Sequence, residues 1–196
     1  MTSQAASEDV QASERRVLLQ VLVLNVLLVV GLGVAGVIGD SSALIANALD
    51  NASDSAVYAI SFFAVGRGAR WKQGAARVSG VLLILFALGV LFDAYRRFVT
   101  GAEPLGPMMM GMGVASAVVN LVCVRLLRRI TTNDVNIRAA TTFSANDAVS
   151  SIGILVAGAL VAWTGRLWPD LAVGVAVALV AVWGAVEILR DARHSE

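Results

Sequence analysis

The chain has 196 residues, of which 58% are hydrophobic and only 15% are charged, and its mean hydropathy is +0.78. These values exclude an ordinary soluble domain and indicate a protein that crosses the membrane several times. A net charge of +1 without a basic cluster excludes a nucleic-acid partner, and Cys123, the single cysteine, excludes a disulfide framework.

The first 14 residues are small and polar, and we expect them to form a disordered cytoplasmic leader. A cleavable signal peptide is not expected, because the apolar run that follows is too long and is not followed by a clear small-residue cleavage site. Residues 15–190 are then predicted to form one transmembrane domain, and residues 191–196 a short cytoplasmic tail.

Six stretches are apolar and long enough to cross about 30 Å of hydrocarbon as helices. The predicted fold class is therefore all-α, a polytopic membrane protein with six transmembrane helices. Most of the 15 Lys and Arg residues lie in the terminal flanks and in the links after the second and fourth stretches, so the positive-inside rule places both termini in the cytoplasm. The predicted spans are 17–38, 43–66, 78–98, 107–128, 137–163 and 168–189.

Two of these spans carry carboxylates at membrane depth, Asp50 and Asp54 in the second and Asp147 in the fifth. A charged side chain at the centre of a bilayer costs about 2.5–3.5 kcal/mol on insertion scales, so such residues usually face the bundle interior and mark an ion path. At about 1.5 Å per residue all three lie near the bilayer midplane. Because the sequence offers no obvious basic partner nearby, a bound cation is the favoured partner.

The second span has its polar residues on one predicted face, because Asn47, Asp50, Asn51 and Asp54 follow an i, i+3, i+4, i+7 spacing. Two carboxylates four residues apart repel one another, so one of them should hold a proton until a divalent cation displaces it. This exchange is a physical route for coupling metal movement to proton movement in the opposite sense.

The fifth span has a shorter polar stripe made by Ser144, Asp147 and Ser151. Asn146 lies about 100° around the helix from Asp147, so its place at the site stays open. Asn25 and Asn120, in the first and fourth spans, are interpreted as helix–helix contacts, as is Asn47 in the second span.

Several residues near the predicted outer ends of the spans have simpler interpretations. Asp93 is expected to pair with Arg96 and Arg97 at the end of the third span. Asp40, in a short outer link, is expected to be solvated. The methionines at the start of the fourth span are interpreted as apolar filling rather than as a soft-metal site; they are Met108, Met109, Met110 and Met112.

Two segments, SSALIANALDNASD (41–54) and NIRAATTFSANDAVSSIGIL (136–155), carry a specific combined pattern. Together they resemble the second and fifth helices of the cation diffusion facilitator family of divalent-metal/proton antiporters, and the resemblance extends from about residue 15 to the end. Phe143 stands where that family's fifth helix usually has a histidine. The chain also stops after the sixth span, without the family's usual cytoplasmic domain. The homodimer that the resemblance implies would therefore form through membrane helices.

The resemblance implies a metal site at Asp50, Asp54 and Asp147, with Asn51, Asn146 or Ser144 as further ligands. Zinc, cadmium or cobalt is the family default, whereas an oxygen-only ligand set favours harder ions such as Mn²⁺ and is compatible with Fe²⁺. The metal would be cargo, and no cofactor is expected.

The expected function is export of divalent transition-metal ions from the cytoplasm by proton antiport with alternating access, across the inner or plasma membrane of a bacterium. The expected partners are the lipid bilayer, divalent metal ions, protons and a second copy of the chain. Two alternatives stay open: a proton-coupled exporter of organic cations, and a non-transporting metal-sensing membrane subunit. None of these is an enzyme.

Overall fold

The computed structural model describes residues 2–64, 69–129 and 135–194, which contain α-helices and no β-strand. The predicted all-α, six-helix membrane fold is confirmed. The helices are α1 (Thr2–Ile38), α2 (Ser42–Ala64), α3 (Ala69–Thr100), α4 (Gly106–Arg128), α5 (Val135–Thr164) and α6 (Trp168–His194).

Three helices, α1, α3 and α6, extend well beyond the predicted spans. Helix α1 begins at Thr2, so the leader that we expected to be disordered is instead continuous with the first span. The physical reason is that this segment contains no Gly or Pro and includes Ala, Gln and Glu, which favour helix. Helix α3 begins at Ala69 rather than at 78, and α6 continues to His194, so most of the expected C-terminal tail is helical.

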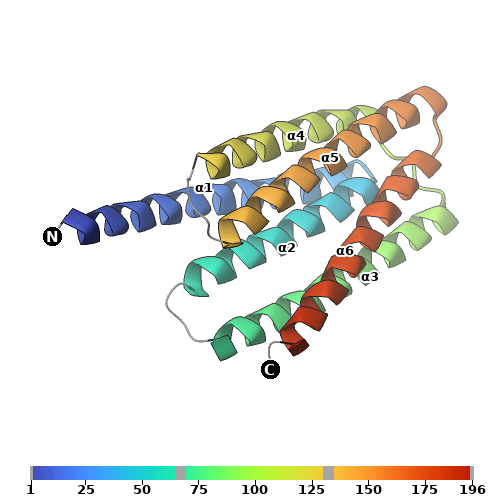
Figure 1. The fold of residues 1–196 in the computed structure, drawn as a ribbon. Coiled ribbons are helices and arrows are strands. Elements are labelled where there is room, and N and C mark those ends of the chain that lie inside the picture. Colours follow the sequence, from blue (N-terminus) through green and yellow to red (C-terminus); the bar gives the residue numbers. More distant parts are fainter. Residues whose placement is uncertain (1, 65–68, 130–134, 195–196) are drawn as a thin grey trace.

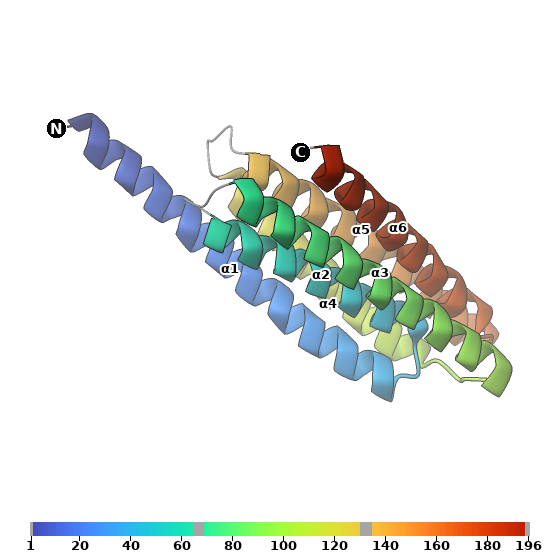
Figure 2. The same cartoon turned by 90° about the horizontal axis from the view of Figure 1, so that it is seen from below.

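The helices pack as three antiparallel pairs, α1 with α2, α4 with α5 and α3 with α6 (Figure 1). Helix α2 is central, because it also contacts α3, α5 and α6. Both chain ends lie at the same end of the bundle (Figure 2), which we call the terminal end. The short links 39–41, 101–105 and 165–167 lie at the opposite end, which we call the link end.

The outer surface of the bundle suits a lipid environment. Among the described residues, four segments are long and apolar enough to cross a membrane, namely Arg15–Ile38, Gly106–Arg128, Ser144–Thr164 and Trp168–Val186. Large apolar side chains such as Leu27, Phe92 and Trp183 point outward and are exposed. In water such a surface would be costly, whereas lipid tails solvate it.

Buried apolar side chains form three clusters. The link-end cluster joins α1, α2, α4 and α5 and contains Leu28, Leu32, Ala35, Ala43, Leu44, Ala48, Met109, Ile154, Ala157 and Val161. The terminal-end cluster joins α1, α2 and α4 and contains Leu18, Val21, Tyr58, Cys123 and Leu127. The third cluster joins α2 to α3 and α6 and contains Ala46, Ala87, Val90, Val177 and Ala178. Met108 and Met112 pack against the link-end cluster, so the apolar interpretation of these methionines and Met109 is confirmed.

Helices α4 and α5 approach closely because glycines face the contact. A Cβ atom added at Gly106 would lie 2.6 Å from the carbonyl oxygen of Gly158, and one added at Gly113 would lie 2.9 Å from the main-chain nitrogen of Leu155. Small residues at such positions let two membrane helices pack backbone to backbone. The close approach places Ser116 of α4 directly against Ser151 of α5, with their hydroxyl oxygens 2.8 Å apart.

The link end holds a network of charged and polar groups, which we call the link-end network. Asp170, at the start of α6, is fully buried and accepts hydrogen bonds from the Ser41 hydroxyl and from the main-chain N–H groups of Ser42 (2.8 Å) and Ala43 (3.1 Å). A side chain of α6 therefore satisfies the free N–H groups at the start of α2, where a negative charge is also favoured by the helix dipole.

Arg97 is the second centre of this network. Its side chain is only 4% exposed, donates to Asp93 at 2.6 Å and also pairs with Asp40, while Arg96 donates to Asp93 at 3.1 Å. The predicted pairing of Asp93 with both arginines is confirmed. Asp40 is partly solvated as expected, since its side chain is 46% exposed, but it also pairs with Arg97 and accepts the N–H of Glu103.

Candidate metal-binding site

The predicted polar face of α2 is divided between two environments. Asn47, Asn51 and Asp54 are buried on the side that meets α4 and α5, whereas Asp50 lines the contact of α2 with α3 and α6. The i, i+3, i+4, i+7 stripe covers more than 100° of the helix surface. Because α2 is surrounded by other helices, the two edges of that stripe meet different neighbours.

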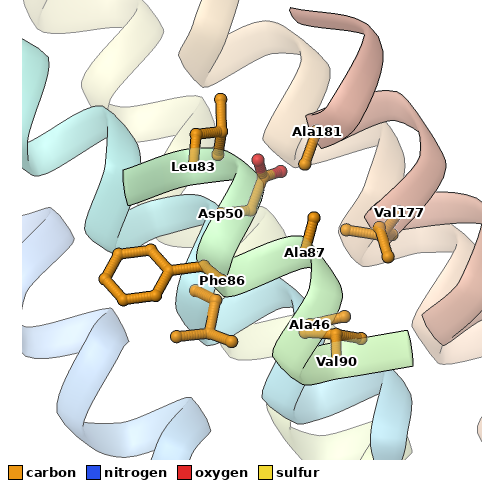
Figure 3. Close-up of a pocket in the computed structure, with 10 residues that line it drawn as sticks. Ala46, Asp50, Leu83, Phe86, Ala87, Val90, Val177 and Ala181 are labelled. Carbon is orange, nitrogen blue, oxygen red and sulfur yellow. The ribbon is translucent and has the colours of Figure 1, made fainter. Parts of the chain in front are cut away.

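Asp50 lies among apolar side chains, as Figure 3 shows. Leu83, Phe86 and Ala87 of α3 and Ala181 of α6 surround it, and the cavity between them has a volume of only about 10 Å³. A space of that size holds one water molecule at most. The carboxylate is therefore poorly hydrated from this side.

A wider groove between α5 and α6 also reaches Asp50, and its volume is about 330 Å³. It is lined by Ser150, Gly153, Ala172, Val173, Ala176, Val177 and Val180. None of these described lining residues is aromatic, and the groove therefore does not supply the aromatic-lined cavity that the organic-cation alternative predicts.

The three carboxylates lie on α2 and α5, two helices that contact one another. Asp54 and Asp147 are both buried, and each has one carboxylate oxygen without a hydrogen-bond partner among the described residues. Asp50, at the other edge of the α2 stripe, borders the groove between α5 and α6. The structure therefore places the acids that the sequence singles out on neighbouring helices.

Tyr58 and Ser144 extend this group towards the terminal end. The Tyr58 hydroxyl donates to Asp54 and lies 3.4 Å from the hydroxyl oxygen of Ser144, which is fully buried. Ser144 thus contacts the site through Tyr58, a residue that the sequence interpretation did not include. Its spacing offered a signal, because Tyr58 continues the Asn51–Asp54 stripe by one turn.

Ser116 of α4 connects the polar residues of three helices. Its hydroxyl oxygen lies 3.4 Å from the amide nitrogens of Asn47 and Asn120 and 2.8 Å from Ser151, which in turn donates to the main-chain carbonyl of Asp147 at 2.7 Å. Asn47 was predicted to mediate a helix–helix contact, and its bond to Ser116 confirms this.

Five buried side-chain oxygens have no hydrogen-bond partner among the described residues. They belong to Asn25 of α1, Asn51 and Asp54 of α2, Asn120 of α4 and Asp147 of α5. We call these five residues the acceptor layer. All five atoms are hydrogen-bond acceptors, and no donor or positive charge among the described residues is paired with them.

Two candidate ligands lie elsewhere. Asn146 is exposed and points away from Asp147, as its position about 100° around the helix allows. The side chain of Phe143 lies outside the described set. Among the described residues no group of three His, Cys, Asp or Glu side chains is close enough to hold a metal ion, so the carboxylates need oxygens from other residues to complete a site.

The sequence profile of the cation efflux transmembrane domain matches residues 18–195. The chain belongs to the cation diffusion facilitator family. The matched region contains α2 to α6, the part of α1 from Leu18 onward, and every residue of the acceptor layer. Members of this family are membrane transporters of cations.

Individual relatives agree with this assignment. The chain is 28% identical over 171 residues to the zinc transporter ZitB of Escherichia coli, covering 81% of this chain and 55% of the relative. It is 29% identical over 127 residues to the cadmium, cobalt and zinc/H(+)-K(+) antiporter of Bacillus velezensis, covering 64% and 41%. It is 25% identical over 162 residues to the metal cation efflux system protein CzcD of Cupriavidus metallidurans, covering 76% and 50%. The chain spans about half the length of these relatives.

Proposed function

We propose that this protein exports divalent transition-metal cations by proton antiport with alternating access. The observation that carries the proposal is the burial of Asp54 and Asp147 on two contacting helices within the membrane, each with a carboxylate oxygen that has no partner among the described residues. Bare carboxylates at this depth are costly, so such a group holds either protons or a cation. Exchange of one for the other couples the two movements.

The residues have distinct roles in this proposal. Asp54 and Asp147 each have an unpartnered oxygen available to a cation, and Asp50 borders both the α3 and α6 contact and the groove between α5 and α6. Tyr58 and Ser151 hold the Asp54 side chain and the Asp147 backbone in place. Ser144 and Asn51 border the same group, whereas the exposed Asn146 is left out of the proposed site.

The names of the relatives point to zinc, cadmium and cobalt as cargo. The described ligand atoms of this chain are all oxygen, and oxygen ligands suit Mn²⁺ at least as well. Both groups of metals therefore belong in the first assay, and the protein acts as a transporter rather than an enzyme.

Flux into reconstituted vesicles under an imposed pH gradient tests the proposal, with Zn²⁺, Cd²⁺, Co²⁺ and Mn²⁺ compared. We expect gradient-dependent flux in the wild type. In Asp54→Asn and Asp147→Asn the flux should fall about 100-fold or more, which exceeds the loss expected when a residue that only supports a ligand is replaced. Glu103→Gln, which removes an exposed carboxylate from a link, is the matched control and should transport normally.

The same assay separates the alternatives. Metal binding without flux in a folded wild type would favour the metal-sensing subunit. Proton flux driven by amines but not by metals would favour the organic-cation exporter. Normal metal flux in both aspartate variants would contradict the proposal outright.

We also propose a homodimer formed through membrane helices in a bacterial plasma membrane, with both termini in the cytoplasm. The basic links and flanks at the terminal end support this orientation. Protease accessibility of an N-terminal tag in vesicles of known orientation tests it, because a tag cut from the external face would reverse the topology.

A further inference from the structure

The acceptor layer extends beyond the two helices that carry the acids. Asn25 belongs to α1 and Asn120 to α4, and both side chains are fully buried. Neither helix contributes one of the three carboxylates. Four helices therefore direct unpartnered oxygens into the interior of the bundle.

Contacts on α4 connect the two asparagines to the acids. The Asn120 amide nitrogen lies 3.4 Å from Ser116, and Ser116 contacts Ser151, whose hydroxyl donates to the carbonyl of Asp147. The Asn25 amide nitrogen lies 4.0 Å from the sulfur of Cys123, one turn along α4 from Asn120. The two asparagines thus reach the acid group through contacts on α4.

The layer is enclosed along the bundle axis. On each of α1, α2 and α4, the acceptor-layer residues lie between residues of the link-end cluster and residues of the terminal-end cluster. Apolar side chains therefore cover the layer at both ends. A group bound there would be shielded from bulk water on both sides.

The orientation of two of the amides, those of Asn25 and Asn51, is fixed by their neighbours. The Asn25 amide nitrogen donates to the carbonyl of Val21 at 2.9 Å, and that of Asn51 donates to the carbonyl of Asn47 at 2.9 Å. Turning either amide over would place two oxygens against each other, so the oxygens of Asn25 and Asn51 must face the layer. Protonation can relieve Asp54 and Asp147, but it cannot relieve a neutral amide oxygen.

We propose that Asn25 and Asn120 are additional cation ligands, which complete with Asn51, Asp54 and Asp147 an oxygen-only site that prefers Mn²⁺ to Zn²⁺. The inference rests on the proposed function and names its preferred substrate. Zinc favours four ligands rich in nitrogen and sulfur, whereas carboxylate and carbonyl oxygens in a larger shell suit harder ions. Amide oxygens from α1 and α4 supply the ligands that α2 and α5 alone lack.

Metal binding to the purified full-length chain tests this inference, with Mn²⁺ and Zn²⁺ as the probes. We compare the wild type with Asn25→Leu and Asn120→Leu, which keep similar side-chain volume and remove the oxygen. The Kd for Mn²⁺ should rise about tenfold or more, while the Kd for Zn²⁺ should change by less than about threefold. Asn146→Leu removes an exposed asparagine next to Asp147 and is the matched control, with both values unchanged.

Asn25→Ser and Asn120→Ser provide a second test should a leucine variant not fold. A hydroxyl oxygen restores part of the ligand set, so each serine variant should bind Mn²⁺ more tightly than the matching variant Asn25→Ala or Asn120→Ala. An equal loss of Mn²⁺ and Zn²⁺ affinity would overturn the proposal. No loss of affinity for either metal would also overturn it, and would indicate that the acceptor layer binds water instead.

The result also separates this inference from the proposed function. If the wild type binds neither metal, both fail together. If the wild type binds metals and the aspartate variants do not, while the asparagine variants behave like the wild type, only the inference about Asn25 and Asn120 fails.

Discussion

The link-end network and the acceptor layer are both buried and polar, yet their hydrogen-bond balance is opposite. In the link-end network Asp170 receives three donors and Arg97 contacts two carboxylates. In the acceptor layer five oxygens have no donor among the described residues. A buried polar group without a partner costs about 1–3 kcal/mol. The link-end network therefore stabilises the fold, whereas the acceptor layer does so only when a cation is bound.

The comparison suggests how to separate structural from functional polarity inside a membrane bundle. Substitutions in the link-end network should lower stability whether or not metal is present. Substitutions in the acceptor layer should cost little in the metal-free protein and should act on binding. Four variants, taken from the largest expected effect on stability to the smallest, test this difference.

Asp170→Ala should have the largest effect. The substitution leaves the N–H groups of Ser42 and Ala43 and the hydroxyl of Ser41 without their acceptor, and we expect a loss of about 3 kcal/mol in the free energy of unfolding. Thermal unfolding in detergent measures it. An unchanged melting temperature would show that the start of α2 finds other acceptors.

Arg97→Gln should cost about 1–2 kcal/mol, because it leaves Asp93 and Asp40 without their shared buried partner. Arg96→Gln is the matched control. Arg96 pairs with the same Asp93 but its side chain is 58% exposed, so its removal should cost less than about 0.5 kcal/mol. Equal effects in the two variants would contradict the assignment of Arg97 as the structural member.

Asp40→Asn should cost less than about 1 kcal/mol, because its side chain is 46% exposed and water can replace part of the contact with Arg97. Chemical unfolding at low and high salt measures the effect. A cost that matches that of Asp170→Ala would show that the exposed edge of the network is as important as its buried centre.

Asp54→Asn sharpens the comparison in the opposite direction. The new amide adds a donor to a region that has only unpartnered acceptors, so the metal-free protein should be as stable as the wild type or more stable by about 1 kcal/mol. Transport should nevertheless be lost. A loss of stability above about 2 kcal/mol would place Asp54 with the structural residues instead.

The sequence predicted the helices and the acids well because both signals are local. A run of about 20 apolar residues must form a helix in lipid, and a carboxylate within such a run is conspicuous. The split of the α2 stripe was not predictable in this way. Whether Asp50 shares an environment with Asn51 depends on which helices surround α2, and spacing within one helix does not contain that information.

Contacts between distant segments were likewise missed. Asp170 meets Ser42 across 128 positions of sequence, and Ser116 meets Asn47 across 69. Asp40 was interpreted as a solvated residue of a link, and Asp170 was not singled out. Asn25 and Asn120 were interpreted as helix contacts, and only their unpartnered oxygens distinguish them from Asn47, whose amide bridges to Ser116.

The capping of α2 by Asp170 also limits how the bundle can change shape. Sliding α2 along α6 by one residue would break the hydrogen bonds from the N–H groups of Ser42 and Ala43 to Asp170. A rotation of α2 about the link end preserves them. Asp50 lies about 12 Å from Ser42 along α2, whereas Ala64 lies about 33 Å away. With the link end as pivot, a small tilt of α2 displaces its terminal end nearly three times as far as Asp50.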